Sequence, residues 1–159
     1  MTETTDKGSA YRSEVIEGFI LLEAIVDCFI NTHYMGKPSM AFHEEVLYDE
    51  YFSFGLKVRI VEKVLDSEEK TVVQSLRRVN NIRNLFAHCG MLRYESGEVF
   101  APNPRKLDKK LDFEALYAEF MERVPILQHF FAKRASKEGA EMLIVRKGRW
   151  EPLFEDDSL

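Results

Sequence analysis

Apolar side chains recur at α-helical spacing in five stretches of this chain. In the first stretch, Ile16, Phe19, Val26 and Ile30 fall on one face, as they do in an amphipathic helix. Gly36 and Pro38 then break the pattern. The spacing predicts helices over residues 9–33, 41–48 (short), 54–65, 66–88 and 112–131.

Acidic residues mark the starts of the last two predicted helices. Asp66 and Glu69 have the spacing of a capping box, in which each side chain accepts a hydrogen bond from the other residue's backbone amide. Asp112 is placed to cap the final helix. Pro125 lies inside that helix and is expected to kink or split it.

Two segments show strand-like alternation. Residues 91–101 alternate around Glu95-Ser96-Gly97-Glu98, which predicts a small β-hairpin closed off by Pro102 and Pro104. Residues 142–150 allow a second hairpin turning at Lys147-Gly148, or an extended arm used in dimer contacts. The fold class expected is therefore all-α, an up-and-down helical bundle with a small β-hairpin addition.

The chain length of 159 residues fits a single domain with a substantial core. The polar residues 1–8 are expected to form a flexible tail, residues 9–136 the helical domain, and residues 137–159 a C-terminal extension. No signal-peptide pattern is visible, and the longest apolar run contains Glu23 and is too short to span a bilayer. We therefore expect a cytoplasmic protein that does not insert into a membrane.

Arg83 interrupts the apolar stripe of the fourth predicted helix. The apolar residues Val72, Leu76, Val79 and Phe86 leave one step of the stripe unfilled, and that step is position 83. At about 100° per residue, Arg83 lies roughly 20° from Val72 and therefore points inward. A guanidinium does not lose its charge in proteins and is costly to bury unpaired.

Glu23 makes a similar interruption in the first helix, where it lies about 40° from Phe19. The simplest prediction is that Glu23 and Arg83 meet. Such a buried ion pair would fix the register of two helices and carry no chemistry. The alternative is that Arg83 lines a cleft or subunit interface that a negatively charged group enters.

Charge is unevenly distributed along the chain, whose formal net charge is −5. Residues 70–93 contain five basic and no acidic residues, so the remainder has 22 − 5 = 17 basic and 27 acidic residues. This stretch, with Arg77, Arg78 and Arg93, is either a patch that contacts the phosphates of RNA or a solvated helix face. No matched cluster of metal ligands is found, so no metal or other cofactor is expected.

Arg83 and His88 together form a workable minimum for cleaving RNA without a metal. The arginine would stabilise charge on the scissile phosphate, and the histidine would move a proton to or from the reacting oxygens. Asn84 would orient the histidine or donate to a phosphate oxygen. The two principal side chains are roughly 140° apart on an ideal helix, so a loosened last turn is needed to bring them together. One copy lacks a second acid or base, and a dimer would supply it.

The motif Arg83-Asn84-x-x-x-His88, near the end of a long helix in a small α-bundle, resembles the HEPN superfamily. The resemblance covers residues 9–131 and is firmest over 52–65 and 76–88, a helix pair that is also similar to the mannitol-operon repressor-like branch of helical regulators. It implies a homodimer whose two motifs face each other across a cleft. Many members are metal-independent endoribonucleases in toxin–antitoxin, abortive-infection and CRISPR settings.

The resemblance assigns catalytic roles to Arg83 and His88 and a supporting role to Asn84. The partners it implies are single-stranded RNA, a second copy of the chain, and an antitoxin or regulatory protein. Noncatalytic members also exist. The alternative function is therefore a helical regulatory or protein-binding module, similar to the mannitol-operon repressor-like proteins, in which Arg83 and Glu23 are structural.

Overall fold

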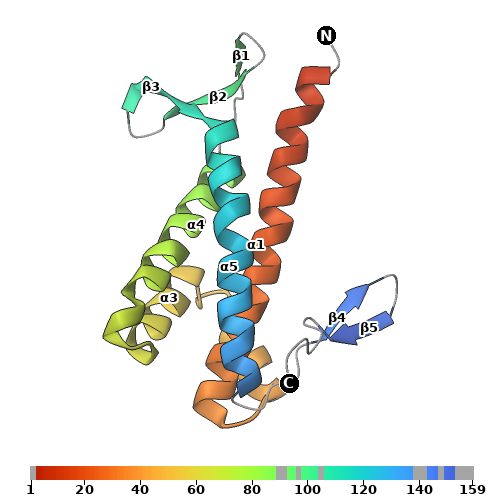
Figure 1. Ribbon diagram of the computed structural model, residues 1–159, viewed down its shortest axis with the longest axis vertical. Coiled ribbons are helices and arrows are strands. Elements are labelled where there is room, and N and C mark those ends of the chain that lie inside the picture. Colours follow the sequence, from red (N-terminus) through yellow and green to blue (C-terminus); the bar gives the residue numbers. More distant parts are fainter. Residues whose placement is uncertain are drawn as a thin grey trace.

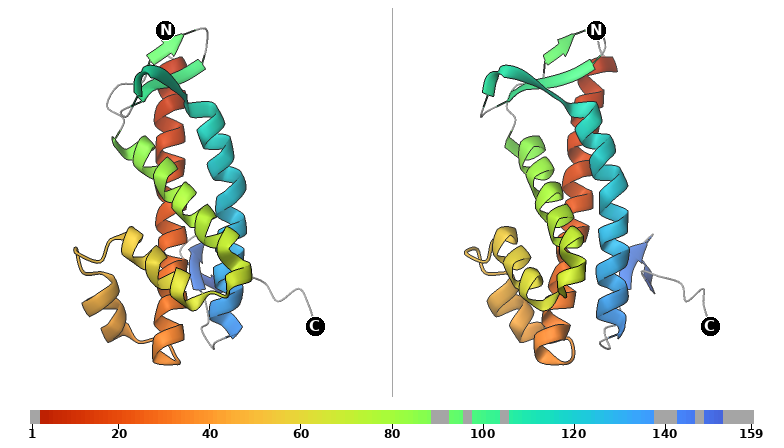
Figure 2. Two further views of the ribbon diagram at one scale, coloured as in Figure 1. Left: turned by 90° about the vertical axis from the view of Figure 1, so that its left-hand side faces the viewer. Right: turned by 60° about the vertical axis from the view of Figure 1, so that its left-hand side comes forward.

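Three long helices run side by side along the molecule. They are α1 (Glu3–Met35), α4 (Lys70–His88) and α5 (Phe113–Lys137). The computed structural model describes the backbone of residues 3–88, 93–95, 98–103, 106–137, 143–146 and 149–152, and the side chains of residues 8–88 and 111–137. Figures 1 and 2 show α1 and α5 running in one direction and α4 returning in the other. The fold is the expected all-α, up-and-down helical bundle.

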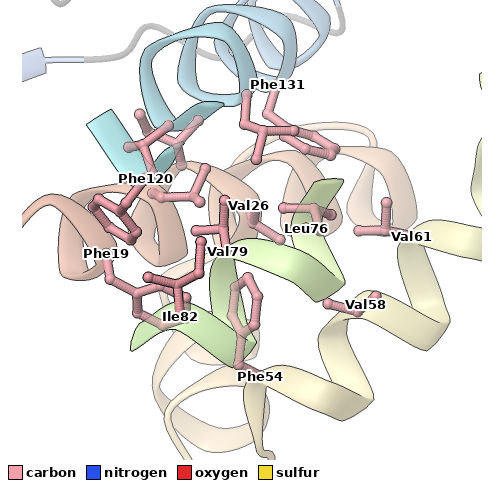
Figure 3. Packing of buried hydrophobic residues seen from close by; sticks show 14 of the residues in the cluster. Phe19, Val26, Phe54, Val58, Val61, Leu76, Val79, Ile82, Phe120 and Phe131 are labelled. Atoms are coloured by element: carbon pink, nitrogen blue, oxygen red, sulfur yellow. The ribbon is translucent and has the colours of Figure 1, made fainter. Parts of the chain in front are cut away.

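The core lies where these three helices meet the shorter α3 (Phe54–Val64). Phe19 of α1 contacts Phe54 of α3 edge to face, with ring centroids 4.6 Å apart. Ile82 of α4 and Phe120 of α5 complete the same apolar layer, which Figure 3 shows. All four side chains are buried, so the inward-facing positions of four helices form one continuous core.

The predicted caps are confirmed. The Glu69 carboxylate accepts a hydrogen bond from the Asp66 backbone amide at 3.2 Å, and the capping box at the short 3₁₀ helix η2 (Ser67–Glu69) leads directly into α4. Asp112 Oδ1 accepts a hydrogen bond from the Ala115 amide at 2.9 Å at the start of α5. These contacts satisfy amides that a helix start otherwise leaves without partners.

The predicted short helix near residues 41–48 is present as α2 (Met40–Phe42) followed by the π-helix η1 (His43–Leu47). The turn before it is fixed by the buried Asn31, whose amide group donates to the Ser39 carbonyl at 2.8 Å and accepts from the Ser39 amide at 2.9 Å. Leu47 is buried in the core. This end of the bundle is therefore anchored on both sides of α2.

The β structure is larger than the sequence pattern indicated. Strands β1 (Arg93–Glu95) and β2 (Glu98–Asn103) form the predicted hairpin, but β3 (Lys106–Asp112) adds a third antiparallel strand. The prediction that Pro102 closes off the hairpin is wrong, because Pro102 pairs with Lys110 and the register shifts directly after it. Proline within a sheet is typically found beside such an irregularity, because it has no amide proton to donate to the ladder. Pro104 lies outside the described part of the chain.

A second hairpin follows α5. It consists of β4 (Leu143–Arg146) and β5 (Arg149–Pro152), as one of the two sequence interpretations proposed. In Figure 1 it lies beside the lower half of α5. The residues of its turn lie outside the described part of the chain.

Two boundaries differ from expectation. The helix α1 begins at Glu3, so it includes residues 3–8, which the sequence pattern had placed before the first helix. The helix α5 continues through Pro125 to Lys137 instead of splitting. Pro125 leaves the carbonyl of Met121 without its helical partner, and both residues are exposed, so solvent is available to that carbonyl.

None of the helices in the described ranges is both long and apolar enough to cross a membrane.

Candidate functional site

Arg83 lies on the face of α4 that packs against α1. Its guanidinium carbon is 4.3 Å from the centroid of the Phe19 ring, a distance at which a cation is attracted to an aromatic face. The side chain is half-buried, and its buried Nε has no hydrogen-bond partner in the part of the chain that the structure describes. The inward position that the sequence predicted for Arg83 is therefore confirmed, but the packing partner is an aromatic ring.

The predicted pairing of Arg83 with Glu23 is wrong. Glu23 Oε1 accepts a hydrogen bond from Lys57 Nζ of α3 at 2.8 Å. Within the described ranges, Arg83 forms no ion pair with a carboxylate. The helical positions of Glu23 and Arg83 specified that both face inward, but not which neighbouring helix each one faces.

Lys57 is the centre of a three-residue charged cluster between α1 and α3. Its Nζ lies 2.8 Å from Asp27 Oδ2 as well as 2.8 Å from Glu23 Oε1. Lys57 is 3 % exposed and Asp27 is 1 % exposed. Burial raises the pKa of Asp27 to about 6, against the lowering effect of the Lys57 hydrogen bond. Among the described residues, Asp27 Oδ1 has no hydrogen-bond partner. Glu23 is therefore part of the attachment of α3 to α1.

Lys57 and Asp27 were not among the site residues predicted from the sequence. Asp27 is four residues after Glu23 and about 40° further round α1, which places it at the edge of the apolar stripe. Lys57 lies between Phe54 and Val58 in the apolar pattern of α3. The sequence features that could have indicated the cluster are a lysine within the apolar pattern of one helix and two carboxylates in or beside the apolar stripe of another.

This cluster predicts an unusual pH dependence of stability. Because the folded-state pKa of Asp27 is about 6 and its ordinary value is 3.8, protonation of Asp27 favours folding. The contribution that protonated Asp27 makes to the free energy of unfolding is fully present below pH 3.8 and is lost as the pH rises through about 6. Relative to Asp27→Asn, whose amide cannot ionise, the wild type should therefore gain free energy of unfolding as the pH falls from 7 to 5.

Urea unfolding of both proteins at several pH values measures this difference. Comparison with the Asn variant cancels the titration of groups that the two proteins share. A difference that stays constant between pH 4 and pH 7 would show that burial does not raise the pKa of Asp27.

The arginines predicted to contact RNA are occupied in the folded chain. Arg77 forms an ion pair with Glu62 at 2.6 Å, and both side chains are exposed. Arg78 donates two hydrogen bonds to the Glu119 carboxylate of α5, at 2.9 and 2.5 Å, and the hydrogen bond from Arg78 is the main reason that the pKa of Glu119 lies below its usual value. The basic patch expected from the sequence is thus largely neutralised along this part of α4. Arg93 lies in β1, and its side chain is outside the described part of the chain.

The last turn of α4 carries Asn84 and His88. Asn84 is half-buried and His88 is exposed. The buried Phe86 packs against Phe113 with ring centroids 4.4 Å apart, which fixes the end of α4 to the start of α5. The backbone remains α-helical through His88, so the expected loosening of the last turn is not present. Arg83 and His88 therefore leave the helix roughly 140° apart.

The surroundings of this end are firmly packed. Tyr117 of α5 stacks on Tyr11 of α1 with ring centroids 4.1 Å apart, and its hydroxyl donates to the Glu14 carboxylate. That hydrogen bond is the main reason that the pKa of Tyr117 rises to about 12. These contacts join α1 to α5, the two long helices against which α4 packs.

Among the described residues, no group of three or more His, Cys, Asp or Glu side chains is arranged to hold a metal ion. No family model, curated protein or solved structure matches this chain. The candidate site is therefore defined by its own geometry: a half-buried arginine with no acidic partner among the described residues, a neighbouring amide, and an exposed histidine at the helix end.

Proposed function

We propose that this chain is a metal-independent endoribonuclease of HEPN type, toxin-like or defence-related, that acts on single-stranded RNA as a homodimer. The proposal rests on the surroundings of the Arg83 side chain. This arginine is a permanent cation at the interface of two helices, it has no carboxylate partner among the described residues, and its orientation is set by the Phe19 ring. Such a group is suited to bind an anion that arrives from outside the chain.

The chemistry assigned to each residue follows from its position. Arg83 is held against Phe19 and would stabilise the negative charge that grows on the scissile phosphate. His88 is exposed and would accept the proton of the RNA 2′-hydroxyl, or donate one to the leaving 5′-oxygen. Asn84 lies between them in sequence and would donate a hydrogen bond to a phosphate oxygen. Glu23, which bonds to Lys57, has no role in this chemistry.

The angle between Arg83 and His88 favours a site shared by two copies. On a regular helix, the side chains diverge by roughly 140°, so one phosphate is poorly placed to contact both from a single copy. A second copy would also provide the second acid or base that transfer of the phosphate from one oxygen to another requires. The two histidines of the dimer would then lie about 6 to 10 Å apart, with each one hydrogen-bonded to the phosphate or an oxygen next to it.

The proposed function is tested by incubating the purified protein with single-stranded RNA in the presence of EDTA. Cleavage is expected to continue under these conditions and to leave a 2′,3′-cyclic phosphate, because the 2′-oxygen attacks the phosphate. RNA of the same sequence with 2′-O-methyl groups should remain intact, since it has no 2′-proton to transfer. Cleavage of the methylated RNA, or complete inhibition by EDTA, would contradict the mechanism.

A noncatalytic regulatory module is the second candidate, and one specific observation favours it. Arg77 and Arg78 form ion pairs with Glu62 and Glu119, so this part of α4 offers few free cations for an RNA backbone. In that case Arg83 would anchor an acidic group of a protein partner. A protein that does not cleave or bind any single-stranded RNA at low salt, yet remains folded and dimeric, would favour this candidate.

A further inference from the structure

The end of the bundle remote from His88 carries an unusual concentration of exposed carboxylates and tyrosines. We call residues 40–51 the acidic end. Figure 1 shows that α1 descends to this end, whereas α4 rises from it toward the β1–β3 sheet. The features of the acidic end therefore belong to a surface separate from the proposed nuclease site, and the inference drawn from them does not rest on that proposal.

The charge of the acidic end is entirely of one sign. Its four acidic residues are exposed, and no lysine or arginine occurs between positions 38 and 56. They are Glu44, Glu45, Asp49 and Glu50. Within the part of the chain that the structure describes, none of the four forms an ion pair. Exposed carboxylates elsewhere do: Glu62, for example, pairs with Arg77.

Two exposed tyrosines alternate with these carboxylates along the segment. Tyr48 is 70 % exposed and Tyr51 is 83 % exposed. The ring of His43 packs edge-on against Tyr48, with centroids 4.8 Å apart, and so limits the orientations of that ring. Met40 adds a further exposed apolar side chain. Three large exposed side chains thus occur within residues 40–51, and grouped exposed apolar surface is typical of an interaction site.

The backbone of the acidic end is anchored before any partner binds. Leu47 is buried in the core, and Asn31 holds the preceding turn through both backbone groups of Ser39. Asp49 Oδ1 accepts a hydrogen bond from the Tyr51 amide at 2.9 Å, which fixes the turn that carries the second tyrosine. Since these contacts already order the segment, a partner loses less entropy on binding than it would with a flexible loop.

We propose that the acidic end is a docking surface for an arginine-rich segment of a partner protein. Carboxylates attract any cation, but the planar guanidinium of arginine also stacks on tyrosine rings and bonds a carboxylate through two donors. The interleaved tyrosines and carboxylates match both of these properties. Lysine offers only a point charge, and nucleic acid is repelled by the four negative charges. The surface therefore selects a protein segment, and among cations it selects arginine.

The test measures binding of a fluorescein-labelled peptide with alternating arginine and serine, by fluorescence anisotropy at low and physiological salt. A peptide of the same length with lysine in place of arginine is the comparison. The full-length protein should bind the arginine peptide more tightly than the lysine peptide. Replacing both exposed tyrosines, Tyr48→Ala with Tyr51→Ala, should weaken arginine-peptide binding about fivefold and remove the preference over lysine.

Two charge-matched variants separate a docking surface from general attraction to an acidic protein. The first carries Glu44→Gln, Glu45→Gln and Glu50→Gln, and it should bind the arginine peptide roughly tenfold more weakly. The second removes the same charge from exposed positions elsewhere, through three Glu→Gln changes at Glu17, Glu68 and Glu122. It should bind as the wild type does.

Equal weakening by the two triple variants would overturn the proposal, because net charge alone would then explain binding. Equal affinity for the two peptides would also overturn it. A concentration-dependent self-association that the first triple variant abolishes and the second preserves would identify a second copy of this chain as the occupant instead. All these substitutions are at exposed positions, and thermal unfolding checks that each variant is folded.

Discussion

Replacing Arg83 by methionine is expected to lower the rate of RNA cleavage by about 10²- to 10³-fold. Methionine keeps an apolar stem against the Phe19 ring but removes the positive charge that would face the phosphate. Arg83→Lys should lose less activity, since it retains the charge but not the flat guanidinium that stacks on the ring. Single-turnover cleavage of single-stranded RNA measures both effects.

The matched control is Arg77→Met on the same helix. Arg77 is exposed and paired with Glu62, and such pairs contribute little. Its cleavage rate should stay within about twofold of the wild type, because it is not part of the Arg83–His88 motif. An equal loss of activity in Arg77→Met and Arg83→Met would mean that net positive charge, and not the position of Arg83, promotes cleavage.

Replacing Lys57 by methionine is expected to lower the free energy of unfolding by about 3 to 5 kcal/mol at pH 7. Lys57 donates to Asp27 and Glu23, and without it Asp27 is left buried next to a second carboxylate. The loss arises from an uncompensated buried charge more than from the value of the ion pair itself. Urea unfolding at a fixed protein concentration measures the change.

A double variant distinguishes this explanation from simple loss of packing. Lys57→Met combined with Asp27→Leu removes the buried cation and the buried carboxylate together, so most of the lost stability should return. Lys63→Met, an exposed change on the same helix, should alter stability by no more than about 0.5 kcal/mol. If the double variant is as unstable as Lys57→Met alone, unpaired charge is not the cause.

The helices were largely predictable because their signals are local. The apolar spacing of α4 and the Asp66–Glu69 capping box set its limits, and Arg83 was correctly expected to point inward. The partner of Arg83 was not predictable in the same way. A helical wheel gives the direction of Glu23 relative to its own axis, and the choice between α3 and α4 as its neighbour depends on how the helices pack.

The β additions show the same limit. The sequence Glu95-Ser96-Gly97-Glu98 is a local signal that predicts a hairpin, and strands β1 and β2 pair as that signal predicted. Strand β3 pairs across a register shift beside Pro102, and a proline within a run argues against a strand when the sequence is read alone. The ion pairs of Arg77 and Arg78 likewise depend on carboxylates from α3 and α5, 15 and 41 residues away in sequence.

The most direct test of the central claim concerns His88. Wild-type and His88→Ala proteins, purified in parallel, are incubated with the same single-stranded RNA and EDTA, and their single-turnover cleavage rates are compared. The account predicts that the wild type cleaves and that the variant is slower by about 10²- to 10⁴-fold, with unchanged thermal unfolding, because His88 is exposed and contributes no core packing. Equal cleavage by the two proteins would contradict it and would identify the activity as a contaminant.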